Sequence, residues 1–176
     1  VSGCSIQGTD DNLCLQSSSL PVNDVHISNC SFSSVCAAIR IGLKSIGSIS
    51  DVHISHCSMK NVWREGIKIE CSEGGNISDI NIQDITMNDV SRPIFILLNN
   101  RFEPDDLGSS LELDHIPEIG TMSDIIISDI IASDSDEMRN THYRFDDDVM
   151  GSPKFAGIRI DAEKNHPIRN LTLRNI

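Results

Sequence analysis

The sequence predicts an all-β solenoid of the parallel β-helix type, because two strand patterns recur along it and no helical apolar period lies between them. The longer pattern has apolar residues at its first, third and sixth positions, with mostly polar residues between. It occupies residues 25–30, 52–57, 80–85, 125–130 and 171–176. Alternation of this kind is typical of a half-buried strand, and its recurrence is typical of stacked coils that share one core.

A shorter pattern, apolar–variable–apolar, follows the longer one and predicts a second strand in each coil. It occupies residues 13–15, 39–41, 67–69, 94–96 and 158–160. Because successive side chains of a strand point to opposite faces, the apolar pair points inward and the middle residue points outward. Aromatic residues make up only 4% of the chain, which suits a narrow core of stacked aliphatic side chains. The leucine spacing of a leucine-rich repeat, the nearest rival fold, is missing.

The domain organisation expected is one β-helix domain over residues 1–176. Both ends fall within the coil pattern, so we expect the chain to be part of a longer solenoid, since solenoids need capping ends. Two departures from the repeat, at about 97–122 and 133–155, predict loops on one face of the coils. The acidic run 146–148 is interpreted as solvated loop, because no calcium-ligand pattern accompanies it.

Composition restricts the partners. The formal net charge of −12 disfavours nucleic acid and anionic membrane surfaces. No apolar run approaches the roughly 18 residues of a membrane span. A local group of cations can still bind an acidic substrate, so a polysaccharide or oligosaccharide remains a suitable partner.

Three of the six cysteines stand at matched points of successive coils. Cys4, Cys30 and Cys57 each precede a serine at the end of a strand pattern. Coils stack about 4.8 Å apart, so these thiols are expected to form an interior column of small buried side chains. Disulfides are the alternative. No metal site is predicted, because the spacing of metal-ligand motifs is missing.

The candidate site lies along one face of the shorter pattern. It contains neighbouring carboxylates and a strip of cations: Asp10, Asp11, Glu65, Glu70, Arg40 and Lys68. Paired carboxylates can protonate a leaving oxygen and activate water, and cations can bind the carboxylates of an acidic sugar polymer. We expect the crowded carboxylates to raise one another's pKa, which would keep one of them protonated. Glu65 and Glu70 are alternatively structural partners of the cations.

Three segments resemble glycoside hydrolase family 28, the polygalacturonases and rhamnogalacturonases. Residues 8–15 resemble the segment of that family that contains a Gly-Asp-Asp motif. Residues 66–77 resemble its basic strand followed by two glycines. Residues 81–94 resemble its next strand segment, which ends in Pro-Ile. The order and spacing of the three segments make the resemblance specific over about residues 1–100 and generic over 120–176.

The resemblance implies a right-handed, pectin-lyase-like β-helix that hydrolyses galacturonate-containing polysaccharide with inversion and without a cofactor. Asp10 matches the general acid of the family, and Asp11 matches one of the two carboxylates that activate water. The other would stand one coil before Val1. Lys68 matches a substrate-binding arginine. The resemblance also favours a secreted or periplasmic location.

The chain departs from the family pattern at three positions. Thr9 replaces the glycine before the two aspartates, Ala37 stands near the place of the family histidine, and Glu70 replaces a lysine. Arg40 is the outward residue next to the missing histidine and is a possible substitute for a cationic contact. These changes predict either a divergent member that acts on another pectic or uronate-containing glycan, or a member that has lost activity.

Two other functions fit the same features. One is a noncatalytic carbohydrate-binding β-helix, in which the coils are only scaffold. The mostly polar outward positions disfavour the apolar trimer faces expected of an adhesin or tailspike. The other is an uronate lyase, which would require calcium and a basic residue to abstract a proton, with Arg40 as its candidate.

Overall fold

The computed structural model describes residues 1–102, 116–135 and 157–176, which form an all-β arrangement of parallel strands without a helix in these ranges. The predicted acidic run at 146–148 and most of the two predicted loops lie outside the described residues. The short strands are β1 (Ser5–Gly8), β2 (Leu13–Leu15), β3 (Val25–Ser28), β4 (Ser31–Ser34), β5 (Ile39–Leu43), β9 (Ile158–Ala162) and β10 (Arg169–Arg174). The long strands are β6 (Ile49–Cys71), β7 (Asn76–Leu98) and β8 (Thr121–Ser133).

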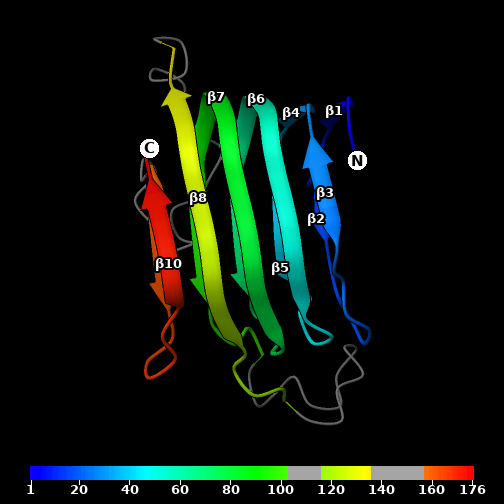
Figure 1. Ribbon diagram of the computed structural model, residues 1–176, viewed down its shortest axis with the longest axis vertical. Coiled ribbons are helices and arrows are strands. Elements are labelled where there is room, and N and C mark those ends of the chain that lie inside the picture. Colours follow the sequence, from blue (N-terminus) through cyan, green and yellow to red (C-terminus); the bar gives the residue numbers. More distant parts are fainter. Residues whose placement is uncertain (103–115, 136–156) are drawn as a thin grey trace.

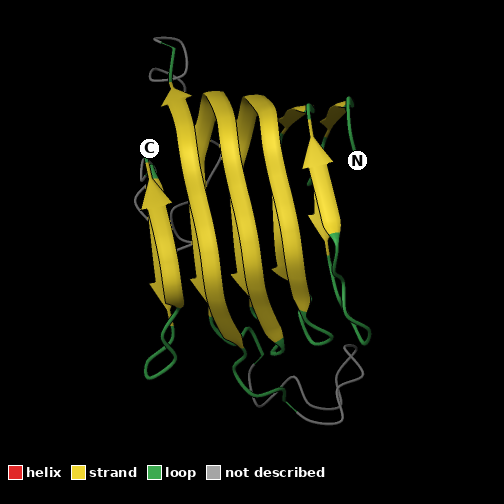
Figure 2. Cartoon of the chain, viewed as in Figure 1, coloured by secondary structure: helices red, strands yellow, loops and turns green. Residues whose placement is uncertain are grey.

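The long strands β6 and β7 bend so that each crosses the front of the molecule and returns behind it (Figures 1 and 2). They pair in parallel from Ile49↔Ile77 to Cys71↔Leu98. Every described ladder is parallel, and the chain returns to the same face after each circuit. This arrangement of long parallel strands is consistent with a parallel β-helix.

The ladder built from the shorter sequence pattern has the predicted register. Leu13 pairs with Ile39, Ile39 with Ile67, Ile67 with Ile94, and Ile94 with Ile158. The middle residues form an outward column in the same register: Cys14, Arg40, Lys68, Phe95 and Arg159. The two strand patterns therefore correspond to two of the segments in each circuit. A third segment is formed by β1, β4, the middle parts of β6 and β7, and the C-terminal part of β8.

The core is a stack of aliphatic side chains inside the coils. Ile39, Ile67 and Ile94 are completely buried in one column, and Ile54 and Ile82 in another. Cys30 and Cys57 are buried as expected, whereas Cys4 is only partly buried, and all three thiols are free. Each donates to the carbonyl two residues earlier, at 3.2 to 3.5 Å. The buried thiols therefore act as small core side chains with a local acceptor.

The corners between segments explain why the longer pattern is flanked by aspartate and asparagine. The residues just before it take a left-handed backbone at four consecutive copies, from φ 55° at Asp24 and Asp51 to φ 57° at Asp124. Aspartate and asparagine tolerate this conformation because their short side chains can hydrogen-bond locally. Asn170 Nδ2 donates to Asp124 Oδ1 at 2.8 Å, which links two corners of one column. The polar corners are therefore part of the repeat.

Candidate functional site

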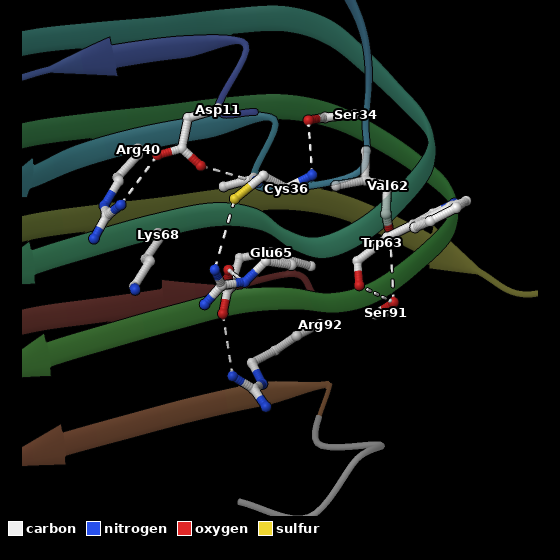
Figure 3. Close-up of polar contacts among 12 residues, drawn as sticks. Asp11, Ser34, Cys36, Arg40, Val62, Trp63, Glu65, Lys68, Ser91 and Arg92 are labelled. Carbon is white, nitrogen blue, oxygen red and sulfur yellow. Dashed lines mark hydrogen bonds and ion pairs between the residues drawn. The ribbon is translucent and has the colours of Figure 1, made fainter. Parts of the chain in front are cut away.

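The candidate site lies on the outward side of the ladder formed by β2, β5, the C-terminal parts of β6 and β7, and β9. We call this surface the charged face; it comprises Asp10, Asp11, Cys36, Arg40, Arg64, Glu65, Lys68, Glu70, Arg92, Phe95, Arg159 and Asp161. Figure 3 shows side chains from successive coils meeting there. Gly42 lets β5 approach β6 closely at this point, because a Cβ at this position would clash with the carbonyl oxygen of Glu70.

Asp11 is held by donors from the next coil. Its carboxylate accepts hydrogen bonds from the Ala37 amide at 3.1 Å and from Arg40 Nη1 at 3.1 Å. Burial raises its pKa, but hydrogen bonds from Cys36, Arg40 and Ala37 and the charge of Arg40 outweigh burial, so the pKa of Asp11 lies below its usual value. The expected mutual raising of pKa between the carboxylates is therefore not found at Asp11, because its donors and Arg40 dominate.

Asp10 differs from its neighbour in exposure. It is exposed at the bend before β2, and its carboxylate accepts the Asp11 amide at 2.7 Å. An oxygen of Asp10, an oxygen of Asp11 and the sulfur of Cys36 lie within 4.8 Å of one another. Two carboxyl groups that invert a glycosidic bond are typically about 6.5–9.5 Å apart. The nearest oxygens of this pair are closer than that range.

Glu70 joins the two predicted cations of the ladder. Its Oε2 lies 2.6 Å from Arg40 Nη2 and 2.9 Å from Lys68 Nζ. Burial raises the pKa of Glu70, but Lys68 and Arg40 outweigh it and bring the pKa below its usual value. The pKa of Arg40 is correspondingly raised, because Glu70 and Asp11 outweigh the effect of burial. Arg40 and Lys68 are therefore already neutralised within the protein.

Glu65 lies in β6, as Lys68 and Glu70 do, but it contacts other cations. It is 2% exposed, and Arg92 Nη1 lies 3.2 Å from its Oε1. Arg64 Nε lies 3.6 Å from Oε2 of the same carboxylate. The structure therefore groups the six predicted residues into a surface pair, Asp10–Asp11, an ion-pair chain through Glu70, and a separate buried carboxylate at Glu65.

The charged face differs from the outward side of a simple alternating strand, where polar side chains are exposed, because several of its charged side chains are buried. Lys68 is 5% exposed and Phe95, the next residue of its column, is 2% exposed. Buried ion pairs contribute little net stability, because desolvation offsets their attraction. Clusters of buried ionisable groups with shifted pKa values are, however, frequent at functional sites. The charged face is therefore the strongest candidate site among the described residues.

The thiol of Cys36 is a member of the site that the sequence did not indicate. Burial, the hydrogen bond to Asp11 and the charge of Asp11 raise its pKa to about 11. Arg64 Nη1 approaches the sulfur at 3.7 Å. Nothing in the sequence pattern marks Cys36, because its contact with Asp11 crosses between coils. Arg159 is another addition, and extending the outward column by one more copy of the shorter pattern would have found it.

A cation would have one place to bind among the described residues. Asp10, Asp11 and Cys36 are the group of carboxylate and thiol ligands close enough together to share one ion. The donors already directed at Asp11 occupy one side of this group.

The described residues contain no helix long and apolar enough to cross a membrane.

Comparisons of this chain with protein families, with curated proteins and with solved structures found no match.

Proposed function

We propose that the chain is a right-handed parallel β-helix that hydrolyses glycosidic bonds in a pectic or other uronate-containing polysaccharide. The winding seen in Figure 1 supports the handedness. The near segments of β6, β7 and β8 run upward, the far segments run downward, and the chain advances from right to left. A chain that advances in this way follows a right-handed path.

The observation that carries the hydrolase proposal is the contrast between two adjacent carboxylates beside a charged strip. Asp10 is exposed, so a substrate can reach it. Asp11 is half-buried and kept ionised by Arg40, Cys36 and the Ala37 amide. Neighbouring carboxyl groups in different environments can take the separate roles of acid and base in glycoside hydrolysis.

The roles are assigned by the resemblance in the sequence, and the lowered pKa of Asp11 supports its part as the base. Asp10 donates a proton to the leaving oxygen, and ionised Asp11 orients and activates water. Arg40 keeps Asp11 ionised and fixes its direction through the 3.1 Å contact. The resemblance in the sequence predicts inversion at the anomeric carbon. The nearest oxygens of Asp10 and Asp11 lie within 4.8 Å, closer than is typical of inverting enzymes. The anomer that is released first therefore tests the predicted inversion.

The test is release of reducing sugar from polygalacturonate and from rhamnogalacturonan by the protein and by its Asp10→Asn variant. The Asp24→Asn variant is a matched control, because Asp24 is an exposed corner residue before β3, on a different ladder. We expect release by the protein and the control, and a loss of at least about 100-fold in the Asp10→Asn variant. Equal release by all three would remove Asp10 from catalysis.

Binding without turnover is the second candidate function, and one observation favours it. Arg40 pairs with Asp11 and Glu70, and Lys68 pairs with Glu70. A scaffold that binds sugar without cleaving it tolerates charged groups that are paired in this way. Binding of either polymer without release of reducing sugar would support this function over hydrolysis. Products that absorb in the ultraviolet would instead indicate an uronate lyase.

A further inference from the structure

Three cations converge on the ring of Phe95, on the coils beyond Arg40. The guanidinium carbons of Arg92 and Arg159 each lie 5.2 Å from the ring centroid, and Lys68 Nζ lies 5.5 Å from it. The ring itself is 2% exposed. Aromatic rings attract cations, but several cations around one ring also repel one another. This arrangement is therefore suited to an added negative charge.

The carboxylates near these cations are shared with other cations. Glu65 faces both Arg92 and Arg64, whereas Glu70 faces both Lys68 and Arg40. The charged groups that act on Arg92 are one carboxylate, Glu65, and two cations, Arg159 and Arg64. Burial lowers the pKa of Arg92; Glu65 opposes this, while Arg159 and Arg64 lower the pKa further, and the pKa lies below its usual value.

Arg92 also has hydrogen-bonding capacity that the protein does not use. The residue is 9% exposed, and its Nε is buried without a hydrogen-bond partner. A buried donor without a partner is costly, and a carboxylate that binds a guanidinium in two places satisfies such a donor. The guanidinium of Arg92 therefore points to a missing acceptor beside Phe95.

We propose that Arg92 and Arg159, over the ring of Phe95, form a binding subsite for the carboxylate of an uronate residue. The proposal rests on the proposed function, because it names a substrate group for the same face. Arg159 Nη2 lies 2.6 Å from Asp161 Oδ2, and the two side chains are 23% and 47% exposed. The incoming carboxylate takes the place of Asp161 on Arg159 and extends toward Arg92.

The position of the subsite fits a polymer that lies across the coils. Cys14, Arg40, Lys68 and Phe95 are consecutive members of one column, so Phe95 is three coils from the strand that follows Asp10 and Asp11. At the usual strand spacing this is roughly 14 Å. The subsite therefore holds a sugar other than the one attacked at Asp10. Arg40 and Lys68 are poorer sites, since Glu70 already neutralises both.

The test is calorimetric titration of the full chain with trigalacturonate and with its methyl ester, which has the same sugars without the charges. Arg159→Gln is the first variant, because this partly exposed residue tolerates replacement better than buried Arg92. Arg92→Gln is the second, with its circular dichroism and thermal unfolding recorded to confirm folding. Arg174→Gln is the matched control, since Arg174 lies in β10 on a different ladder.

We expect the charged trimer to bind at least about tenfold more weakly to Arg159→Gln and to folded Arg92→Gln, since each loses a charge-assisted hydrogen bond. The control should bind as the unaltered protein does. Asp161→Asn should bind the charged trimer more tightly, because it removes the competing carboxylate. The methyl ester should bind the protein and its variants alike.

Two results would overturn the subsite. One is equal affinity of the protein for the charged trimer and its methyl ester, and the other is unchanged affinity in Arg159→Gln together with Asp161→Asn. Because the titration measures binding alone, a charge preference without reducing-sugar release would retain the subsite and reject the hydrolase. Release that depends on Asp10 without any charge preference would do the reverse.

Discussion

Two outward columns of the same coils differ sharply in what surrounds them. On the ladder through β3, which we call the histidine face, the outward residues are His26, His53, Asn81, Ile126 and Thr172. There His26 and His53 stack with ring centroids 5.1 Å apart, and their side chains stay 66% and 47% exposed. On the charged face, Lys68 and Phe95 are almost completely buried. An outward position in a strand is therefore not equivalent to an exposed one.

The difference shows where the molecule tolerates unfavourable desolvation. Each histidine contacts its own exposed aspartate, Asp24 or Asp51, and solvent screens these pairs. On the charged face, one carboxylate of Glu70 serves two cations at low exposure. Such a network is sensitive to the loss of any member, because the remaining charges are left buried.

The largest expected effect is that of Glu70→Gln, which leaves Arg40 and Lys68 without their shared charge. Breaking a buried ion pair typically costs about 3–5 kcal/mol. We expect a loss of this size in the free energy of unfolding measured by urea denaturation. Asp24→Asn, the matching change on the histidine face, should cost under about 0.5 kcal/mol. Similar losses for both variants would contradict the contrast between the faces.

The next effect concerns the core that both faces share. Ile67 is completely buried, whereas Ile126 is 40% exposed on the histidine face. Replacing a buried isoleucine with alanine typically costs about 2–5 kcal/mol, through lost transfer energy and the cavity that remains. Ile67→Ala should therefore unfold at clearly lower urea than Ile126→Ala. If the exposed site cost as much as the buried one, the assignment of inward and outward residues would be wrong.

The pH dependence of stability should also distinguish the charged face from the histidine face, with a smaller effect than the two substitutions above. The pKa values of Asp11 and Glu70 are lowered by folding from the reference values of 3.8 and 4.5. Their stabilising contribution is thus fully present above those values and is lost as the pH falls through the folded pKa of each group. Urea midpoints measured from pH 6 to pH 2 should fall steeply below about pH 4.

The Asp11→Asn variant checks the origin of this pH dependence. It should show a shallower fall than the unaltered protein, because one of the two groups no longer titrates. Burial, the hydrogen bond to Asp11 and the charge of Asp11 together raise the pKa of the Cys36 thiol to about 11. The variant keeps the burial but loses the charge, so its Cys36 should be alkylated faster at pH 9. Mass spectrometry of the Cys36 peptide measures this rate. An unchanged rate would remove Asp11 as the partner of the thiol.

The smallest effect is expected at the histidine stack. His53→Ala removes a ring that stacks on His26 and an exposed hydrogen bond with Asp51 at 3.0 Å. Exposed pairs of this type contribute about 0–1 kcal/mol. The variant should therefore unfold within about 1 kcal/mol of the unaltered protein at pH 7. A larger loss would mean that the histidine face is also a cooperative network.

The sequence by itself determined two of the strand segments in each circuit and their register, but not the third segment, which contains β1 and β4. Alternation identifies inward residues such as Ile67 and outward ones such as Lys68, and the recurrence aligns them from coil to coil. Both follow from local geometry, since a strand has a period of two and parallel stacking keeps equivalent residues in register. The same reasoning placed Arg40 and Lys68 in one column and Asp11 on the same face.

Only the tertiary structure decided which of those side chains are neutralised, buried or left with an unused donor. The pairing of Arg40 with Glu70, the contact of Cys36 with Asp11 and the convergence of Arg92 and Arg159 on Phe95 all join different coils. Such contacts depend on side-chain directions and on desolvation, which a linear pattern does not contain. Charge and pKa at the site are properties of neighbours in space, and that is why they emerge only once the coils are stacked.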